Sequence, residues 1–183
     1  MTVDSLTAAQ PKTPSGFHAF LLADVDVVDF GQGEYVDVVF RDRTRLRARA
    51  SAEILRLGSR LHGQHRVTLH FRTDLDGTLL EPLHLYRRRD LDTTLEPTTG
   101  TYWSAVGLAL PGSLSMMVYL ERARTPPFQI TFKYDVKPSI LVSPGTGMRL
   151  NGIVRAGQLI ATNVIPVEHL LIPERWRYWT KEL

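Results

Sequence analysis

Short apolar runs that alternate with polar residues, each closed by turn residues, recur along this chain of 183 residues. The stretches EYVDVVF (residues 34–40) and HRVTLHFR (residues 65–72) place an apolar residue at nearly every second position. A period of two is that of a β-strand with one buried face, because successive side chains point to opposite sides of a sheet. The chain is therefore predicted to be all-β with a minor helical part.

Residues 51–61 carry the one convincing helical pattern of the first half. Ser51 is a suitable N-cap, and the apolar Ile54, Leu55 and Leu57 are expected to face inward. Further along, the TDLDG segment (residues 73–77) carries an Asp-Gly hairpin signal and predicts a tight turn between two strands.

Between residues 17 and 88 the predicted order is strand, strand, strand, helix, strand, strand. This order resembles the OB-fold, a five-stranded Greek-key barrel with a helix between its third and fourth strands. The second half repeats the plan without an obvious helix. We therefore predict tandem OB-like five-stranded Greek-key barrels, and one larger β-barrel or sandwich is the alternative.

The predicted organisation follows from where these patterns begin and end. It comprises a flexible N-terminal arm (1–16), a first OB-like domain (17–88), a linker (89–100), a second OB-like domain (101–168) and a C-terminal aromatic and basic tail (169–183).

Composition excludes several classes of protein. The absence of cysteine rules out disulfide frameworks, thiolate metal sites and a cysteine nucleophile. A hydrophobic fraction of 43% and a charged fraction of 22% are those of a globular protein, and the formal net charge is only +3. With no secretory signal and no apolar run of about 18 residues, we expect a cytoplasmic protein that does not engage a membrane.

The segment RDRTRLRARA (residues 41–50) places an arginine at every second position. In an extended strand, alternation sends Arg45, Arg47 and Arg49 outward, about 7 Å from one another. That separation is inside the Debye length of roughly 8 Å at physiological salt, so the three charges repel one another. Carboxylates such as Asp37 and Glu34 offset part of this repulsion, and a polyanion would relieve the rest.

The candidate nucleic-acid-binding residues are cationic or aromatic side chains expected to point outward, mostly from the first barrel. They are Tyr35, Arg41, Arg45, Arg47, Arg49, Arg66, Arg72, Tyr86, Arg87 and Trp103. His70 and His84 also fall at outward positions of the same predicted strands. Cations that follow phosphates and rings on which unpaired bases stack are what a binder of single strands needs.

In plan the chain resembles OB-fold single-stranded DNA-binding proteins. That resemblance implies non-catalytic, sequence-tolerant binding of single-stranded DNA or RNA, with DNA the first expectation, in a groove across the first barrel and often in an oligomer. The chain lacks that family's long Gly/Pro/Gln-rich tail with an acidic tip. The hypothesis requires residues 45–49 to be extended and their guanidinium groups to be unoccupied by carboxylates of the same chain.

The alternative function is a structural or assembly module. Exposed β edges and the RWRYW segment (residues 175–179) would then make homo-oligomer or partner contacts. Catalysis is not expected: SPGTG (residues 143–147) lacks the Gly-Lys-Ser/Thr of a P-loop, and no carboxylate completes a metal site with the histidines. No enzyme activity, cofactor or metal is therefore predicted.

Overall fold

The computed structural model describes residues 16–28, 33–57, 64–87, 101–112, 114–120, 126–135 and 142–177. The predicted linker (89–100), nearly all of the N-terminal arm and the last six residues of the tail lie outside this set. The first half contains five strands and one helix. They are β1 (His18–Val28), β2 (Tyr35–Phe40), β3 (Arg45–Ala50), α1 (Ala52–Leu57), β4 (Gln64–His70) and β5 (Leu83–Arg87).

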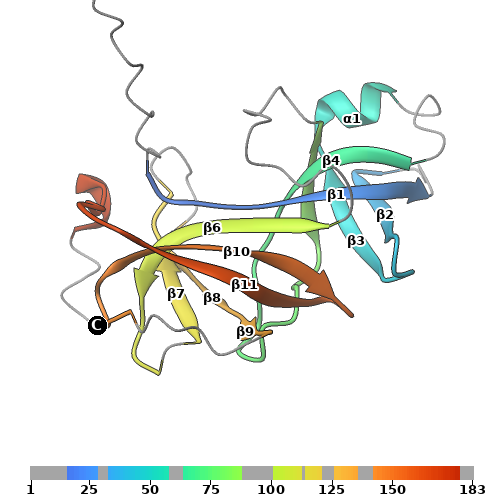
Figure 1. The fold of residues 1–183 in the computed structure, drawn as a ribbon. Helices are drawn as coiled ribbons and strands as arrows, with labels where there is room; N and C mark the ends of the chain where they lie inside the picture. The colour runs from blue at the N-terminus through green and yellow to red at the C-terminus, as the bar shows by residue number, and fades with distance from the viewer. Residues whose placement is uncertain are drawn as a thin grey trace, which may run out of the picture.

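These five strands close into a barrel, with α1 between β3 and β4 (Figure 1). Antiparallel pairing joins β1 to β2, β2 to β3, β5 to β4 and β4 back to β1. The ring closes because β3 and β5 run parallel, with Ala48 beside Leu83 and Ala50 beside Leu85. The order β1-β2-β3-β5-β4 around the ring is that of an OB-like barrel, so the predicted fold of the first half is confirmed.

The second half repeats this strand order. Its strands are β6 (Tyr102–Ala109), β7 (Ser115–Val118), β8 (Phe128–Thr131), β9 (Lys133–Tyr134), β10 (Gly147–Arg155) and β11 (Gln158–Val167). Antiparallel pairing joins β6 to β7, β7 to β8, β11 to β10 and β10 back to β6. The chain continues from β8 through Phe132 into β9, which pairs in parallel with β11. The all-β tandem plan is confirmed.

The two barrels share one continuous sheet because their first strands pair with each other. One edge of β1 pairs with β4, while the other edge pairs with β6 over residues 18–22 and with β2 over residues 25–28. Strand β6 is used in the same way, with β10 on one edge and β1 followed by β7 on the other. Figure 1 shows β1 and β6 side by side between the two units.

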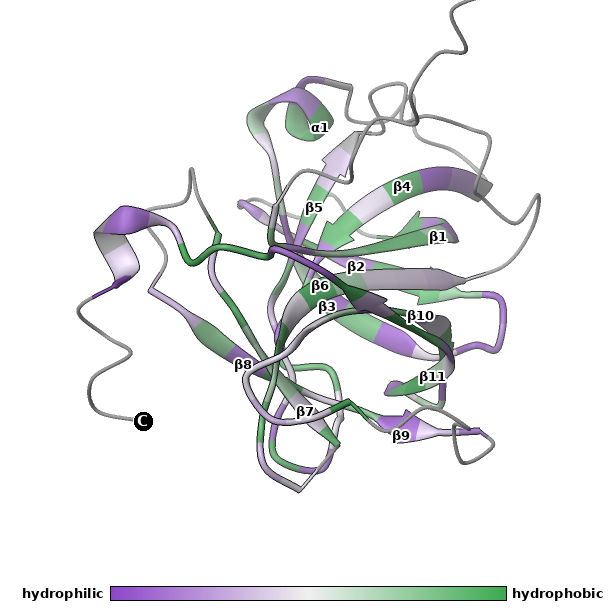
Figure 2. Cartoon of the chain, turned by 60° about the vertical axis from the view of Figure 1, so that its left-hand side comes forward, coloured by the Kyte–Doolittle hydropathy of each residue, from purple (hydrophilic) through white to green (hydrophobic). Residues whose placement is uncertain are grey.

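The core follows from alternation along the strands. Inward positions carry apolar residues, and hydropathy changes from residue to residue along β4 and β8 (Figure 2). In β4 the inward Val67 and Leu69 are buried, and in β8 Ile130 is fully buried. One cluster of buried residues runs from the first barrel into the second.

Trp103 lies where the two barrels meet. Its side chain is fully buried, and its Nε1 donates to the carbonyl oxygens of Ile153 and Ile160 at 3.0 and 3.2 Å. Its ring contacts Phe71 of the first barrel and Phe132 of the second, at centroid distances of 6.4 and 6.3 Å. The prediction that Trp103 stacks on bases is therefore wrong. Burial of its large apolar ring in the core stabilises the fold, and a ring buried there cannot contact a base.

Replacement of Trp103 by alanine is expected to destabilise the protein by about 3–5 kcal/mol, because it leaves a large cavity and two carbonyl groups without their donor. Chemical denaturation measures the change. The matched control is Trp176→Ala, since that half-buried ring sits at the periphery and donates to Leu120 O at 3.2 Å. Equal losses from both variants would contradict a central role for Trp103.

The loop between β4 and β5 (residues 71–82) fastens the first barrel to the second. Its Leu79 N donates to Gly157 O at 2.8 Å, and Gly77 O accepts from Leu159 N at 3.1 Å. The predicted turn is present, because Asp74 Oδ1 accepts from the backbone of Asp76 and Thr78 at 2.9 and 2.8 Å. A loop that often borders the ligand in OB-folds thus makes inter-barrel contacts here.

His18 is a second fixed point of the junction between β1 and β6. Its Nε2 lies 3.1 Å from Ser104 Oγ, and its ring stacks on Phe20 at a centroid distance of 5.2 Å. Burial, together with the positive charge of Arg149, lowers the pKa of His18 from 6.5 to about 4. The imidazole is therefore neutral in the folded protein at neutral pH.

This lowered pKa predicts a pH dependence of stability. Between pH 6.5 and 4, His18 is protonated in the unfolded chain but not in the folded protein. The contribution of neutral His18 to the free energy of unfolding is therefore complete above pH 6.5 and is lost as the pH falls toward 4. The expected loss of unfolding free energy is at most about 3 kcal/mol. Denaturation at pH 7 and pH 4.5 measures it. His18→Gln should remove this component, whereas His169→Asn, at an exposed turn, should keep it.

Candidate nucleic-acid interface

Strand β3 is extended, as the arginine pattern predicts. Arg45, Arg47 and Arg49 are exposed, while Ala48 and Ala50 are buried against the barrel core. The turn before β3 is tight, because Phe40 N donates to Thr44 O at 2.9 Å. The first requirement of the hypothesis is therefore met.

The second requirement is not met by two of the three arginines. Arg45 Nε donates to Asp37 Oδ2 at 3.0 Å, and Arg49 Nη2 lies 2.7 Å from Glu34 Oε2. Both carboxylates come from β2 or the residue that precedes it, next to β3 in the sheet. The expectation that these guanidinium groups would be unoccupied is wrong, because the neighbouring strand supplies their counter-ions.

Arg47 differs from its neighbours. Among the described residues its guanidinium has no ion-pair partner, while its backbone N–H donates to Glu81 Oε1 at 2.6 Å. Glu81 thus joins Asp37 and Glu34 beside the three arginines of β3. The outer face of this strand is close to electrically neutral.

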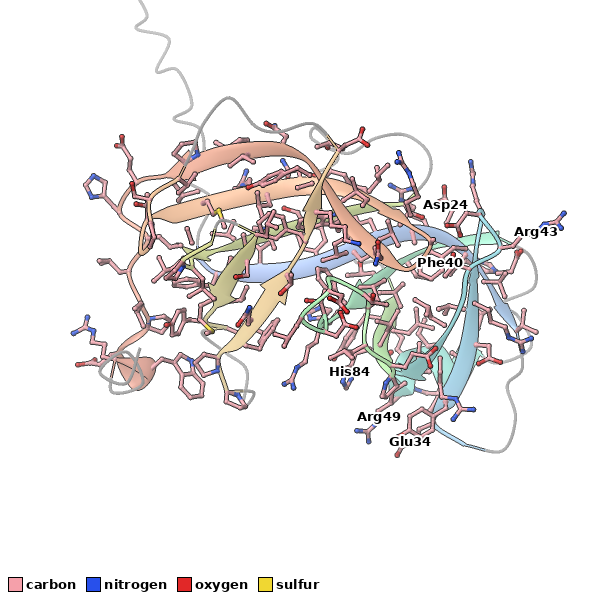
Figure 3. All side chains as sticks on the ribbon, turned by 90° about the horizontal axis from the view of Figure 1, so that it is seen from below. Asp24, Glu34, Phe40, Arg43, Arg49 and His84 are labelled. Carbon is pink, nitrogen blue, oxygen red and sulfur yellow. The ribbon has the colours of Figure 1, made fainter. Side chains whose placement is uncertain are left out.

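Arg41 and Arg66 belong to a different part of the surface. Both form ion pairs with Asp24 of β1, whose side chain is only 15% exposed. Arg41 Nη2 lies 3.2 Å from Asp24 Oδ2, and Arg66 Nη1 lies 3.1 Å from Asp24 Oδ1. Figure 3 places Asp24 well away from Glu34 and Arg49. The structure does not bring Arg41 and Arg66 together with the arginines of β3 into one site.

Of the remaining predicted cations, Arg72 is also separate from β3. The Arg72 guanidinium lies over the Phe128 ring, 5.4 Å from its centroid, and so joins the first barrel to β8. Arg87 ends β5, and its side chain lies outside the described part of the chain.

A row of four side chains crosses the outer face of the first barrel from β2 to β4. Strand register places Tyr35 beside Arg49, Arg49 beside His84, and His84 beside His70. We call Tyr35, Arg49, His84 and His70 the Arg49 row. The parallel pairing of β3 with β5 creates it, since that pairing makes Arg49 and His84 neighbours.

Tyr86 extends the row with a further ring. It lies two residues after His84 on β5, and its centroid is 4.8 Å from that of His70. Tyr35 is 49% exposed and Tyr86 42% exposed, so both predicted stacking residues present their rings to solvent. Rings and a guanidinium therefore share one face.

The equivalent positions of the second barrel carry neither arginine nor aromatic rings. The β7–β8 pairs that correspond to the β2–β3 pairs include Ser115 with Thr131 and Met117 with Gln129. Lys133 of β9 is exposed and bonds Gln158 Oε1 at 2.8 Å. The described β7–β8 pairs therefore carry no counterpart of the Tyr35–Arg49 pair.

A hollow of about 490 Å³ adjoins the Arg49 row beside the start of α1. Its lining combines charged, aromatic and apolar groups. The residues are Glu34, Arg49, Ala50, Ser51, Ala52, Leu55, His84 and Tyr86. Leu55, predicted to face inward, instead lies at the surface and lines this hollow, while Ile54 is buried. Figure 3 shows Glu34, Arg49 and His84 gathered at this side of the barrel.

The pKa of His70 is affected by its surroundings in the row. Partial burial of its ring, and then the positive charge of His84, lower the pKa of His70 below its ordinary value of 6.5. At neutral pH the neutral form of His70 is favoured, and acidification adds positive charge to this face.

Replacement of His84 by glutamine is expected to raise the pKa of His70, because it removes the like charge that opposes protonation. Titration of the His70 ring by NMR measures the shift. His169→Asn, on the turn after β11, is the control and should leave that titration unchanged. A downward shift in His84→Gln would contradict the electrostatic coupling.

No group of three or more His, Asp or Glu side chains in the described ranges is placed to hold a metal ion. No helix within those ranges has the length and apolar character needed to cross a bilayer.

Sequence reasoning left His70, His84, Leu55 and Glu34 out of the candidate site. The signal for the histidines was available, because both occupy outward positions and the OB-like order places β3 beside β5. The sequence carried no such signal for Leu55, because the position of its side chain depends on how a helix of only six residues packs on the barrel.

Comparison with known proteins adds no relative. No protein-family model, no curated protein and no solved structure matches this chain.

Proposed function

We propose that this protein binds single-stranded DNA across the outer face of its first barrel. The observation that carries the proposal is the Arg49 row with Tyr86 beside it, since this face combines exposed rings with guanidinium groups. Proteins that bind single strands use stacking platforms together with cations that follow the backbone. The strands of an OB-like barrel are a common place for such a face.

The dimensions of the row fit a short stretch of nucleic acid. It crosses three gaps between neighbouring strands, each of about 4.8 Å, and so spans about 14 Å. At about 3.4 Å per stacked nucleotide this accommodates roughly four nucleotides. Such a length is at the lower end of the site sizes of single OB-folds.

The hypothesis drawn from the sequence required unoccupied guanidinium groups, and two of the three are paired, so the proposal rests on stacking instead of on phosphate contacts by unpaired arginines. Arg45 and Arg49 already have carboxylate partners, so the face gains less from counterion release than unpaired arginines would. Exposed ion pairs are worth at most about 1 kcal/mol, so a phosphate can replace a carboxylate at small cost. We therefore expect stacking to supply most of the affinity, with a shallow salt slope of about 0.7 per phosphate neutralised.

Two observations favour this proposal over an assembly module. In the described residues both edges of β1 and of β6 are paired, which leaves neither barrel's first strand available for augmentation. Trp176 of the tail packs on its own chain and donates to Leu120 O. These strands and the Trp176 ring are thus already engaged within the described part of the chain.

The proposal is tested by fluorescence anisotropy with a labelled oligo-dT. Tyr86→Ala is expected to weaken binding about 5- to 150-fold, since stacking contributes about 1–3 kcal/mol per base. Tyr86→Phe keeps the ring and should bind nearly as the wild type does. No binding by the wild-type protein at low salt, or equal affinity of the alanine and phenylalanine variants, would overturn the proposal.

Removal of a carboxylate beside β3 should have the opposite effect on affinity and tighten binding. Asp37→Asn releases Arg45 and is expected to tighten binding and to steepen its salt dependence. The comparison of Arg47→Ala, expected to weaken binding, with Arg43→Ala on the turn away from the row locates the effect (Figure 3). An Asp37→Asn variant that binds more weakly than the wild type would contradict the proposed phosphate contacts.

A further inference from the structure

The hollow beside the Arg49 row is more than a stretch of the strand face. It is an open depression of about 490 Å³, lined by residues of α1, β3, β5 and the segment before β2. Its walls differ in character. Tyr86 and His84 supply rings on one side, and Leu55 and Ala52 supply apolar contact on another. A flat aromatic ring such as a nucleobase is the kind of group that such walls accommodate.

The polar group of the hollow is the Glu34–Arg49 pair. Arg49 Nη2 lies 2.7 Å from Glu34 Oε2, while Glu34 Oε1 has no hydrogen-bond partner among the described residues. The main chain of Glu34 is fixed next to β3, because Ala50 N donates to Glu34 O at 2.7 Å. The pair therefore presents two carboxylate oxygens, which accept, next to a guanidinium group, which donates.

We infer that this hollow takes one guanine base of the bound strand, an inference that rests on the proposed function. On its Watson–Crick edge guanine presents two adjacent donors, N1–H and the N2 amino group, followed by the O6 acceptor. Glu34 accepts from the two donors and Arg49 donates to O6. Tyr86 or His84 stacks on the ring.

The other bases fit the pair less well. Thymine has a single donor between two acceptors, and adenine has one donor beside one acceptor. Cytosine presents one donor and two acceptors, so with its N4 amino group on Glu34 and its N3 and O2 on Arg49 it gives the carboxylate one hydrogen bond where guanine gives two. Only guanine offers the two neighbouring donors that one carboxylate can bind together.

The test compares an oligo-dT with the same oligonucleotide carrying one central guanine. A good bidentate contact discriminates by about 1–3 kcal/mol, so the guanine is expected to tighten binding roughly 5- to 150-fold. Inosine, which lacks the 2-amino group, should lose most of this gain. A wild-type protein that binds all three oligonucleotides equally would overturn the inference while leaving the proposed function standing.

Two variants distinguish the specific role of the Glu34 carboxylate from the effect of removing one negative charge from this face. Glu34→Gln should abolish the preference for guanine while oligo-dT still binds, because a single amide oxygen cannot accept from both donors. Asp37→Asn is the matched control, since it also releases an arginine of β3 but does not line the hollow, and it should keep the preference. If Glu34→Gln retains the full preference, the assignment of Glu34 fails. If the wild type binds no oligonucleotide, the proposed function fails and the inference with it.

Discussion

The parallel pairing of β3 with β5 is the contact on which the first barrel and its outer face both depend. It closes the ring of five strands, and it brings Arg49 and His84 together although 35 positions separate them in the sequence. Antiparallel pairing alone would leave these side chains on two open edges. The same arrangement recurs where β9 meets β11, so each half of the molecule closes through one parallel pair.

Much of the fold follows from the sequence by alternation. The period of two in residues 34–40 and 65–72 predicts strands, and the order of the elements predicts the OB-like ring. The pairing of β1 with β6 could not be predicted in the same way. Leu21, Leu22 and Ala23 are consecutive buried residues, and a run without alternation does not indicate which neighbour covers which face.

The candidate site was predictable in its residue types but not in its contacts. Alternation correctly sends Arg45, Arg47 and Arg49 outward, yet it does not indicate that Asp37, which lies opposite Arg47 in the register, pairs diagonally with Arg45. The position of Trp103 depends on two carbonyl groups near a bulge between β10 and β11, where Gly152 leaves no space for a Cβ atom. Such contacts depend on strand register, which residue identity alone does not determine.

The two similar barrels belong to one chain and are joined through the hydrogen-bonded pairing of β1 with β6, so each half has its own stretch of sequence. In a pair of identical subunits every substitution would appear twice, once on each subunit. Here Tyr35 and Arg49 occupy one barrel while Ser115 and Thr131 occupy the matching pair of the other. Each barrel can therefore accumulate substitutions independently of the other. One barrel can acquire a recognition face while the other serves only as a scaffold.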